Sequence, residues 1–174
     1  MEKILIADDE QLMRQLVIDF LRPEGYEILE ASDGKEALEI YDKEHPDLIL
    51  LDVMMPGYDG WTVCREIRRE STVPIMMLTA KGEEIDQLFA YDLSADEYIT
   101  KPFSPKILVA KIKALYKKRR DLMCESMKKY FPEGITFTYP EGGLFTWVTL
   151  PEGMDAKELM PKVLAKNVAY VPGG

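Results

Sequence analysis

Five polar residues of this sequence stand at or just after the ends of apolar segments, and together they could carry out phosphoryl chemistry. They are Asp8, Asp9, Asp52, Thr79 and Lys101. Clustered carboxylates repel one another, and a hard divalent cation relieves that repulsion because it prefers oxygen ligands. We therefore expect Asp9 and Asp52 to bind Mg²⁺ directly, and Asp8 to act through a water molecule.

With a metal ion in place, the carboxylate of Asp52 could attack a phosphoryl donor and form an acyl phosphate. The metal and Lys101 would neutralise the charge that develops on the phosphoryl oxygens. Thr79 would then donate a hydrogen bond to the attached phosphoryl group. This bond would pull Thr79 inward, a change that a nearby aromatic side chain could follow.

Each of these residues also has a simpler interpretation. Asp8 or Asp9 could cap a helix, and Asp52 could begin a turn. Thr79 could be a helix cap, and Lys101 could be an ordinary solvated lysine. Their joint placement at successive strand ends favours a common site, because ligands of open α/β sheets bind outside the carboxyl ends of the strands.

The elements that must position these residues alternate along the chain. Short apolar runs predict five strands, at residues 3–7, 26–30, 47–52, 74–79 and 97–100. Apolar residues at helical spacing lie between them, including a helix predicted at Glu83–Leu93. Such alternation implies a parallel sheet covered by helices on both faces. The third run is the most apolar, which is typical of a central strand.

Composition and charge argue against two classes of function, sequence-independent nucleic-acid binding and membrane insertion. The net charge of -9 argues against sequence-independent binding to nucleic acid, which needs a basic surface. No apolar run is long enough to cross a membrane, and the N-terminus has no signal-peptide layout, so we expect a cytoplasmic protein. Cys64 and Cys124 have no metal-ligand spacing and are expected to be free thiols.

Residues 1–119 resemble the receiver domain of two-component response regulators. The resemblance rests on Ile-Ala-Asp8-Asp9-Glu10, Leu-Leu-Asp52-Val-Met-Met-Pro-Gly, Met-Leu-Thr79-Ala and Asp96-Glu97-Tyr98-Ile-Thr-Lys101-Pro-Phe. It implies a flavodoxin-like, doubly wound parallel five-stranded sheet in the order 2-1-3-4-5. It also implies Mg²⁺-dependent phosphotransfer to Asp52 from a histidine kinase or a small phosphodonor. Such a domain accepts a phosphoryl group and is not a turnover enzyme.

The resemblance also implies a role for each matching residue. Asp8 and Asp9 match the acidic metal-binding pair, Met54 the residue whose backbone carbonyl binds the metal, Thr79 and Lys101 the phosphoryl-contacting pair, and Tyr98 the switch aromatic. The Lys101–Pro102 bond matches one that is usually cis.

Residues 116–174 resemble part of the small C-terminal domain of fold-type I aminotransferases, which use pyridoxal phosphate. The resemblance predicts a helix, a strand pair around Gly142-Gly143, a helix over 155–166 and a short final strand, with Phe145 and Trp147 facing a core. That family's Schiff-base lysine lies in a large domain that this sequence does not contain. We therefore expect no aminotransferase activity.

The two resemblances meet inside one predicted helix, at about residues 105–130. We expect two parts, a receiver domain at 1–119 and a small α/β fragment at 116–174, that share this helix. An engineered chimera explains the junction, and an alternative function is then a scaffold with inherited receiver chemistry and no physiological output. Phe89 and Ile107 stand where related receivers usually carry charged residues on their dimer face, so we expect this face to be buried against the C-terminal fragment or another chain, such as that of a homodimer; ordinary sequence drift is the alternative. We also expect the edge of strand 144–149 to be covered.

Overall fold

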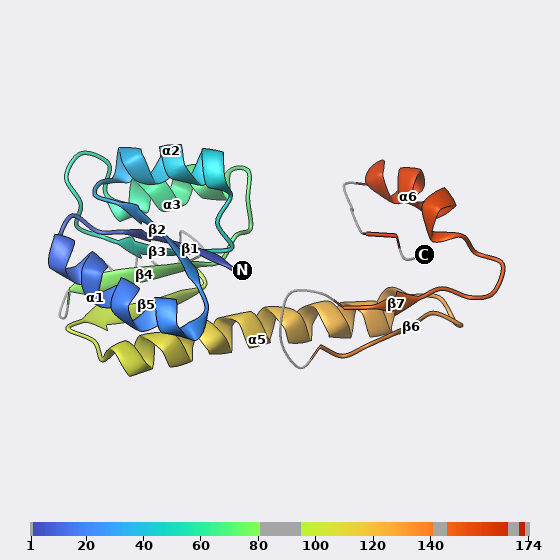
Figure 1. The fold of residues 1–174 in the computed structure, drawn as a ribbon. Helices are drawn as coiled ribbons and strands as arrows, with labels where there is room; N and C mark the ends of the chain where they lie inside the picture. Colours follow the sequence, from blue (N-terminus) through green and yellow to red (C-terminus); the bar gives the residue numbers. More distant parts are fainter. Residues whose placement is uncertain (1, 81–94, 141–145, 167–170, 173–174) are drawn as a thin grey trace. The chain divides into compact units, whose positions relative to one another are not determined.

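A computed structural model of the chain describes residues 2–80, 95–140, 146–166 and 171–172 (Figure 1). The chain divides into two compact units, Met1–Tyr116 and Lys117–Gly174. Each unit is described by itself. Within the described ranges, no helix combines the length and the hydropathy needed to cross a bilayer.

The first unit is built on a five-stranded parallel sheet. Its strands are β1 (Lys3–Ala7), β2 (Glu27–Ala31), β3 (Leu48–Asp52), β4 (Ile75–Ala80) and β5 (Glu97–Lys101), and their order across the sheet is β2-β1-β3-β4-β5. The order implied by the receiver resemblance is therefore confirmed. Every residue of β3 is buried, as expected for a central strand.

Helices cover both faces of this sheet (Figure 1). They are α1 (Gln11–Leu21), followed by the 3₁₀ turn η1 (Arg22–Glu24), then α2 (Gly34–Glu44), α3 (Gly60–Arg68) and α5 (Pro105–Tyr130). In Figure 1, α2 and α3 lie on one face, and α1 and the first part of α5 lie on the other. The helix predicted at Glu83–Leu93 lies outside the described residues.

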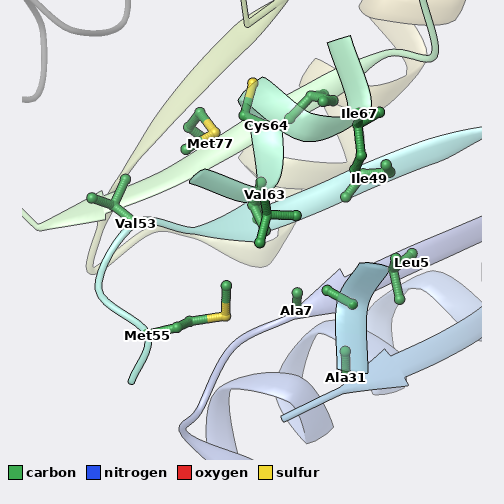
Figure 2. Close-up of a cluster of buried hydrophobic side chains, with 13 residues drawn as sticks. Leu5, Ala7, Ala31, Ile49, Val53, Met55, Val63, Cys64, Ile67 and Met77 are labelled. Carbon is green, nitrogen blue, oxygen red and sulfur yellow. The ribbon is translucent and has the colours of Figure 1, made fainter. Parts of the chain in front are cut away.

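Alternation along the strands divides the core into two layers. Leu5, Ile49 and Met77 point toward α2 and α3, where Figure 2 shows them packed with helix residues such as Val63. Their strand neighbours, including Ile4, Leu50 and Met76, pack instead against α1 and α5. Full burial of an aliphatic side chain contributes about 1.5–3 kcal/mol, so the two layers hold the sheet and the helices together.

Local signals set where two of the helices begin. The side chain of Asp33 accepts hydrogen bonds from the amides of Lys35 and Glu36, both at 2.9 Å, and caps α2. Asp59 caps α3 by accepting from the amide of Thr62 at 2.7 Å. These caps fix the ends of the β2–α2 and β3–α3 connections, the second of which follows Asp52.

Helix α5 is one helix of 26 residues, as the sequence predicted, and the boundary between the two units falls within it. The second unit adds an antiparallel pair of short strands, β6 (Thr136–Phe137) and β7 (Val148–Thr149), and the helix α6 (Ala156–Leu164). A strand pair and a helix near 155–166 were predicted. The turn at Gly142-Gly143 lies outside the described residues, and the described residues 171–172 form no strand.

The prediction that Trp147 faces a core is wrong, because its side chain is 71% exposed. Within the described part of the second unit, only Cys124 and Pro140 are buried, so no core layer exists there for an indole to enter. Phe145 lies outside the described residues. Val148 is 37% exposed in the single chain, and the predicted cover over this edge stays a prediction.

The predicted interface pair is only partly described. Ile107 lies in the first turn of α5 and is 53% exposed in the single chain. Phe89 lies outside the described residues. Burial of this pair against the C-terminal fragment or another chain therefore remains a prediction.

Candidate functional site

Strand register brings the predicted site residues to one edge of the sheet. Ala7 lies opposite Leu51, so the next residues, Asp8 and Asp52, end neighbouring strands. Asp52 in turn lies opposite Leu78, directly before Thr79. Because the carboxyl ends of parallel strands meet at one edge, residues far apart in the sequence become neighbours here.

The last member of the site comes from β5, where Lys101 lies opposite Ala80. Its peptide bond to Pro102 is cis, as the receiver resemblance implied. All the residues predicted for the site from strand ends are therefore brought to the same edge.

The three carboxylates form a compact acidic cluster. One oxygen from each of Asp8, Asp9 and Asp52 can be chosen so that all three lie within 4.8 Å of one another. Asp8 and Asp52 are buried, whereas Asp9 is exposed. The cluster is therefore open to solvent on the side of Asp9.

Both carboxylate oxygens of Asp8 already have partners. Oδ1 accepts a hydrogen bond from the backbone amide of Glu10 at 3.0 Å, and Oδ2 pairs with Lys101 Nζ at 2.7 Å. The interpretation of Asp8 or Asp9 as the cap of the first helix is wrong, because the N-cap of α1 is Glu10 and no side chain caps this helix. The full engagement of Asp8 agrees with an indirect role at a metal, through water.

Lys101 bridges the two buried acids. Its Nζ lies 2.7 Å from Asp8 Oδ2 and 2.9 Å from Asp52 Oδ1. Burial alone would lower the pKa of Lys101, but its hydrogen bonds with Asp8 and Asp52 and their charges outweigh that effect and raise the pKa. The amine therefore stays charged. The interpretation of Lys101 as a plain solvated lysine is wrong.

The charge of Asp52 is disfavoured by its surroundings. Burial raises its pKa above the ordinary aspartate value, and the charges of Asp8 and Asp9 act in the same direction. Lys101 opposes this rise without cancelling it. Asp52 Oδ2 accepts no hydrogen bond from the described residues, and this oxygen keeps some contact with solvent. It is the oxygen that a second reactant can reach.

Thr79 lies next to the cluster near the end of β4, and Tyr98 lies opposite Met77 near the start of β5. Thr79 is 6% exposed, and its hydroxyl donates to the carbonyl oxygen of Ala80 at 3.3 Å. Tyr98 is half-buried and packs against the core layer under α2 and α3. Met54, two residues after Asp52, is exposed in the connection to α3. These positions agree with the roles implied by the resemblance and do not by themselves test them.

A close backbone approach fixes the connection that follows Asp52. A Cβ atom added at Gly60 would lie 2.2 Å from the backbone carbonyl oxygen of Asp52, so no side chain fits there. The amide of Gly60 also donates to the carbonyl oxygen of Val53 at 3.0 Å. Gly60, the first residue of α3, thus packs against the backbone of Asp52 and holds it in position. Sequence reasoning missed this role, although Asp59-Gly60 has the form of a helix start.

The donor set suits Mg²⁺. Ligands about 2.1 Å from one ion lie at most about 4.2 Å apart, so oxygens within 4.8 Å of one another need only a small side-chain adjustment to share an ion. All the candidate ligands are oxygens, and the cluster carries three formal negative charges against one lysine. A hard cation therefore fits the site in charge, ligand type and size.

Comparisons with known proteins agree with this geometry. The family model for the response regulator receiver domain matches residues 4–113. The chain is 52% identical over 117 residues to the "Probable transcriptional regulator ycf27" of Galdieria sulphuraria, a match that covers 67% of this chain and 46% of that relative. A protein of the same name from Cyanophora paradoxa is 50% identical over 117 residues, covering 67% of this chain and 49% of that relative. The chain thus spans about half the length of the curated relatives it matches.

Solved structures give the same result. A two-component response regulator from Clostridium difficile is 34% identical with a TM-score of 0.65, covering 68% of this chain and 98% of that one. Chemotaxis protein CheY4 of Vibrio cholerae is 33% identical with a TM-score of 0.63, covering 66% and 98%. The family model, the strand order and the acidic edge all agree, and the chain belongs to the response regulator receiver domain family.

Proposed function

We propose that this chain accepts a phosphoryl group on Asp52 in a Mg²⁺-dependent reaction, from a histidine kinase or a small phosphodonor. The observation that carries the proposal is the state of the Asp52 carboxylate. Its Oδ1 is paired with Lys101 at 2.9 Å, whereas its Oδ2 lies within a cluster of acids and accepts no hydrogen bond from the described residues. A carboxylate with one oxygen anchored by a lysine, and the other not bonded to any described residue, is positioned for nucleophilic attack.

In the proposed step, Asp52 Oδ2 forms a bond to phosphorus. The bond between phosphorus and the donor breaks, and the leaving group keeps the electron pair, as acetate when the donor is acetyl phosphate. Asp9, Asp52 and the backbone carbonyl of Met54 would hold a Mg²⁺ ion, with Asp8 acting through water, and the ion would supply positive charge for the phosphoryl oxygens. The rest of the chemistry falls to side chains of this chain.

Lys101 has two tasks in this proposal. Before the reaction it neutralises part of the charge of Asp8 and Asp52, and during it the same amine can follow the charge that moves onto the phosphoryl group. The hydroxyl of Thr79 would exchange its contact with the Ala80 carbonyl for a phosphoryl oxygen. Tyr98, which packs against the core layer, would follow Thr79 inward and change the surface of β5.

The cellular context is also proposed. We infer a phosphoacceptor that catalyses its own phosphorylation and dephosphorylation and is not a turnover enzyme. We propose a cytoplasmic location, a histidine kinase as transient partner, and pairing with a second copy through the face that contains Ile107. We propose no direct contact of this chain with nucleic acid or membrane.

The C-terminal part stays open in one respect. Residues 117–174 lie beyond the family match, which ends at residue 113, and their resemblance to an aminotransferase fragment remains a prediction. The comparisons give no support to the alternative of an engineered scaffold without output. Aminotransferase activity is not proposed.

The proposed function can be tested by incubating the protein with acetyl phosphate and Mg²⁺ and measuring its intact mass. We expect one added phosphoryl group, which disappears in Asp52→Asn and when EDTA removes the metal. Asp42→Asn is a suitable control, since Asp42 is an exposed aspartate on α2, and it should be phosphorylated like the unmodified chain. Addition of a phosphoryl group to Asp52→Asn, or none to the unmodified chain, would refute the proposal.

A further inference from the structure

An arginine outside the acidic cluster is bonded to the backbone that carries two of its members. Arg14 lies in the first turns of α1, and its Nη1 donates to the backbone carbonyl oxygen of Asp8 at 2.7 Å and, more weakly, to that of Asp9 at 3.4 Å. The side chain is only 14% exposed. The side chain of Arg14 therefore folds back from α1 onto the loop between β1 and α1.

The other side of the guanidinium faces the end of β2. Arg14 Nε lies 3.6 Å from Glu30 Oε2, too far for a hydrogen bond, and is a buried donor without a partner in the described part of the chain. A buried donor left in this state costs free energy. The arginine is held in place despite that cost, which indicates that its bonds to the two carbonyl oxygens determine its position.

We propose that Arg14 is a positioning residue for the metal site. By binding the carbonyl oxygens of Asp8 and Asp9, it fixes the two peptide planes and so directs both carboxylates toward the edge of the sheet. Groups that orient the ligands of a metal often matter almost as much as the ligands, and their loss typically weakens metal binding 10–100-fold. The inference rests on the proposed Mg²⁺ site.

The charge of Arg14 and its hydrogen bonds predict opposite effects on Mg²⁺ affinity when the residue is replaced. A positive charge close to a cation site weakens cation binding, so removal of the charge alone would tighten binding of Mg²⁺. Loss of the two hydrogen bonds would free the Asp8–Asp9 backbone and weaken binding. The direction of the change in affinity therefore separates the two effects.

The experiment is a calorimetric titration of MgCl₂ into the full chain, at constant ionic strength, with the metal-free melting temperature measured alongside. We expect Arg14→Met to weaken Mg²⁺ binding by about 10-fold or more. Arg14→Lys keeps the charge but replaces the planar fork by one ammonium group, and we expect a loss of about threefold or more. Arg22→Met, which removes an exposed arginine at the end of the same helical segment, should bind like the unmodified chain.

The outcomes separate the two levels of the argument. If the unmodified chain binds no Mg²⁺, the proposed function and this inference both fail. If it binds Mg²⁺, and Arg14→Met binds equally well or more tightly, only the role of Arg14 is overturned, even if the variant melts earlier. If Arg14→Met does not fold, Arg14→Lys decides: weakened binding supports the role, and unchanged binding overturns it.

Discussion

Replacing Asp52 with asparagine should stabilise the metal-free protein and remove its stabilisation by Mg²⁺. The change keeps the size of the side chain and removes one negative charge from a buried position. The raised pKa of Asp52 means that the folded protein holds the neutral form of this group more favourably than the unfolded chain does. A neutral amide should therefore be better tolerated than the ionised carboxylate.

The distances give the magnitude. At an effective dielectric constant of about 20, two unit charges at the upper limit of 4.8 Å repel by about 3.5 kcal/mol, so Asp8 and Asp9 together repel Asp52 by on the order of 7 kcal/mol. Lys101, at 2.9 Å, returns about 5.7 kcal/mol on the same scale. Lys101 therefore offsets the repulsion from the two acids, and burial of the charged form is the largest effect, which leaves the pKa of Asp52 raised. We expect Asp52→Asn to raise the metal-free stability by about 1–2 kcal/mol, or a melting temperature rise of roughly 4 °C per kcal/mol.

The assay is thermal unfolding followed by circular dichroism, first in EDTA and then with Mg²⁺. At a Mg²⁺ concentration of about 100 times Kd, binding should stabilise the unmodified chain by about 2.7 kcal/mol. Asp52→Asn lacks one carboxylate ligand and should gain much less, so the order of stability should reverse. As the pH falls through the raised pKa of Asp52, protonation relieves the repulsion, and the difference between the two metal-free proteins should shrink.

Two results would refute this reasoning. If Asp52→Asn melts below the unmodified chain in EDTA, the ion pair with Lys101 dominates, and the balance of charges derived above is wrong. If Mg²⁺ stabilises both proteins equally, Asp52 is not a ligand. Asp42→Asn provides the control for loss of an exposed charge and should change stability by less than about 0.5 kcal/mol under both conditions.

Three further predictions concern the scaffold and can be read from urea unfolding. Gly60→Ala would place Cβ 2.2 Å from the carbonyl oxygen of Asp52 and should destabilise the protein by about 1–3 kcal/mol while weakening Mg²⁺ binding; an unchanged midpoint would contradict the close approach. Leu50→Ala removes a fully buried side chain of the central strand and should cost about 2–5 kcal/mol; a loss under about 1 kcal/mol would place Leu50 outside the core. Lys3 lowers the pKa of Glu44 through their hydrogen bond, so this pair stabilises the fold above the ordinary glutamate pKa and loses that effect as the pH falls through the lowered value. The stability of Glu44→Gln should accordingly fall less than that of the unmodified chain between about pH 5 and 3, and parallel profiles would show that the pair contributes nothing.

The sequence was sufficient to predict the sheet and the residues at its edge, because both follow from the order of apolar and polar residues along the chain. The run that became β3 is apolar at every position up to its final aspartate, as a strand buried on both faces must be. Strand bounds moved by about one residue, for example from 26–30 to Glu27–Ala31, since the exact ends depend on pairing with neighbouring strands.

Contacts within the site could not be predicted in the same way. That Lys101 bridges Asp8 and Asp52 depends on the register of three strand pairs and on the path of the chain after β5. Arg14 was missed because its partners are backbone carbonyl oxygens, which leave no signature in residue types. The error at Trp147 had the opposite cause: an apolar residue type was taken to indicate a core that the described part of the second unit does not form.

The central claim is that carboxylates from two strand ends, Asp9 after β1 and Asp52 at the end of β3, share one hard cation. Crystals grown with Mn²⁺, which has oxygen-ligand preferences close to those of Mg²⁺ and a usable anomalous signal, would test it directly. We expect one strong anomalous peak within coordinating distance of both carboxylates. A peak bound to only one of them, or no peak at this edge of the sheet, would contradict the account.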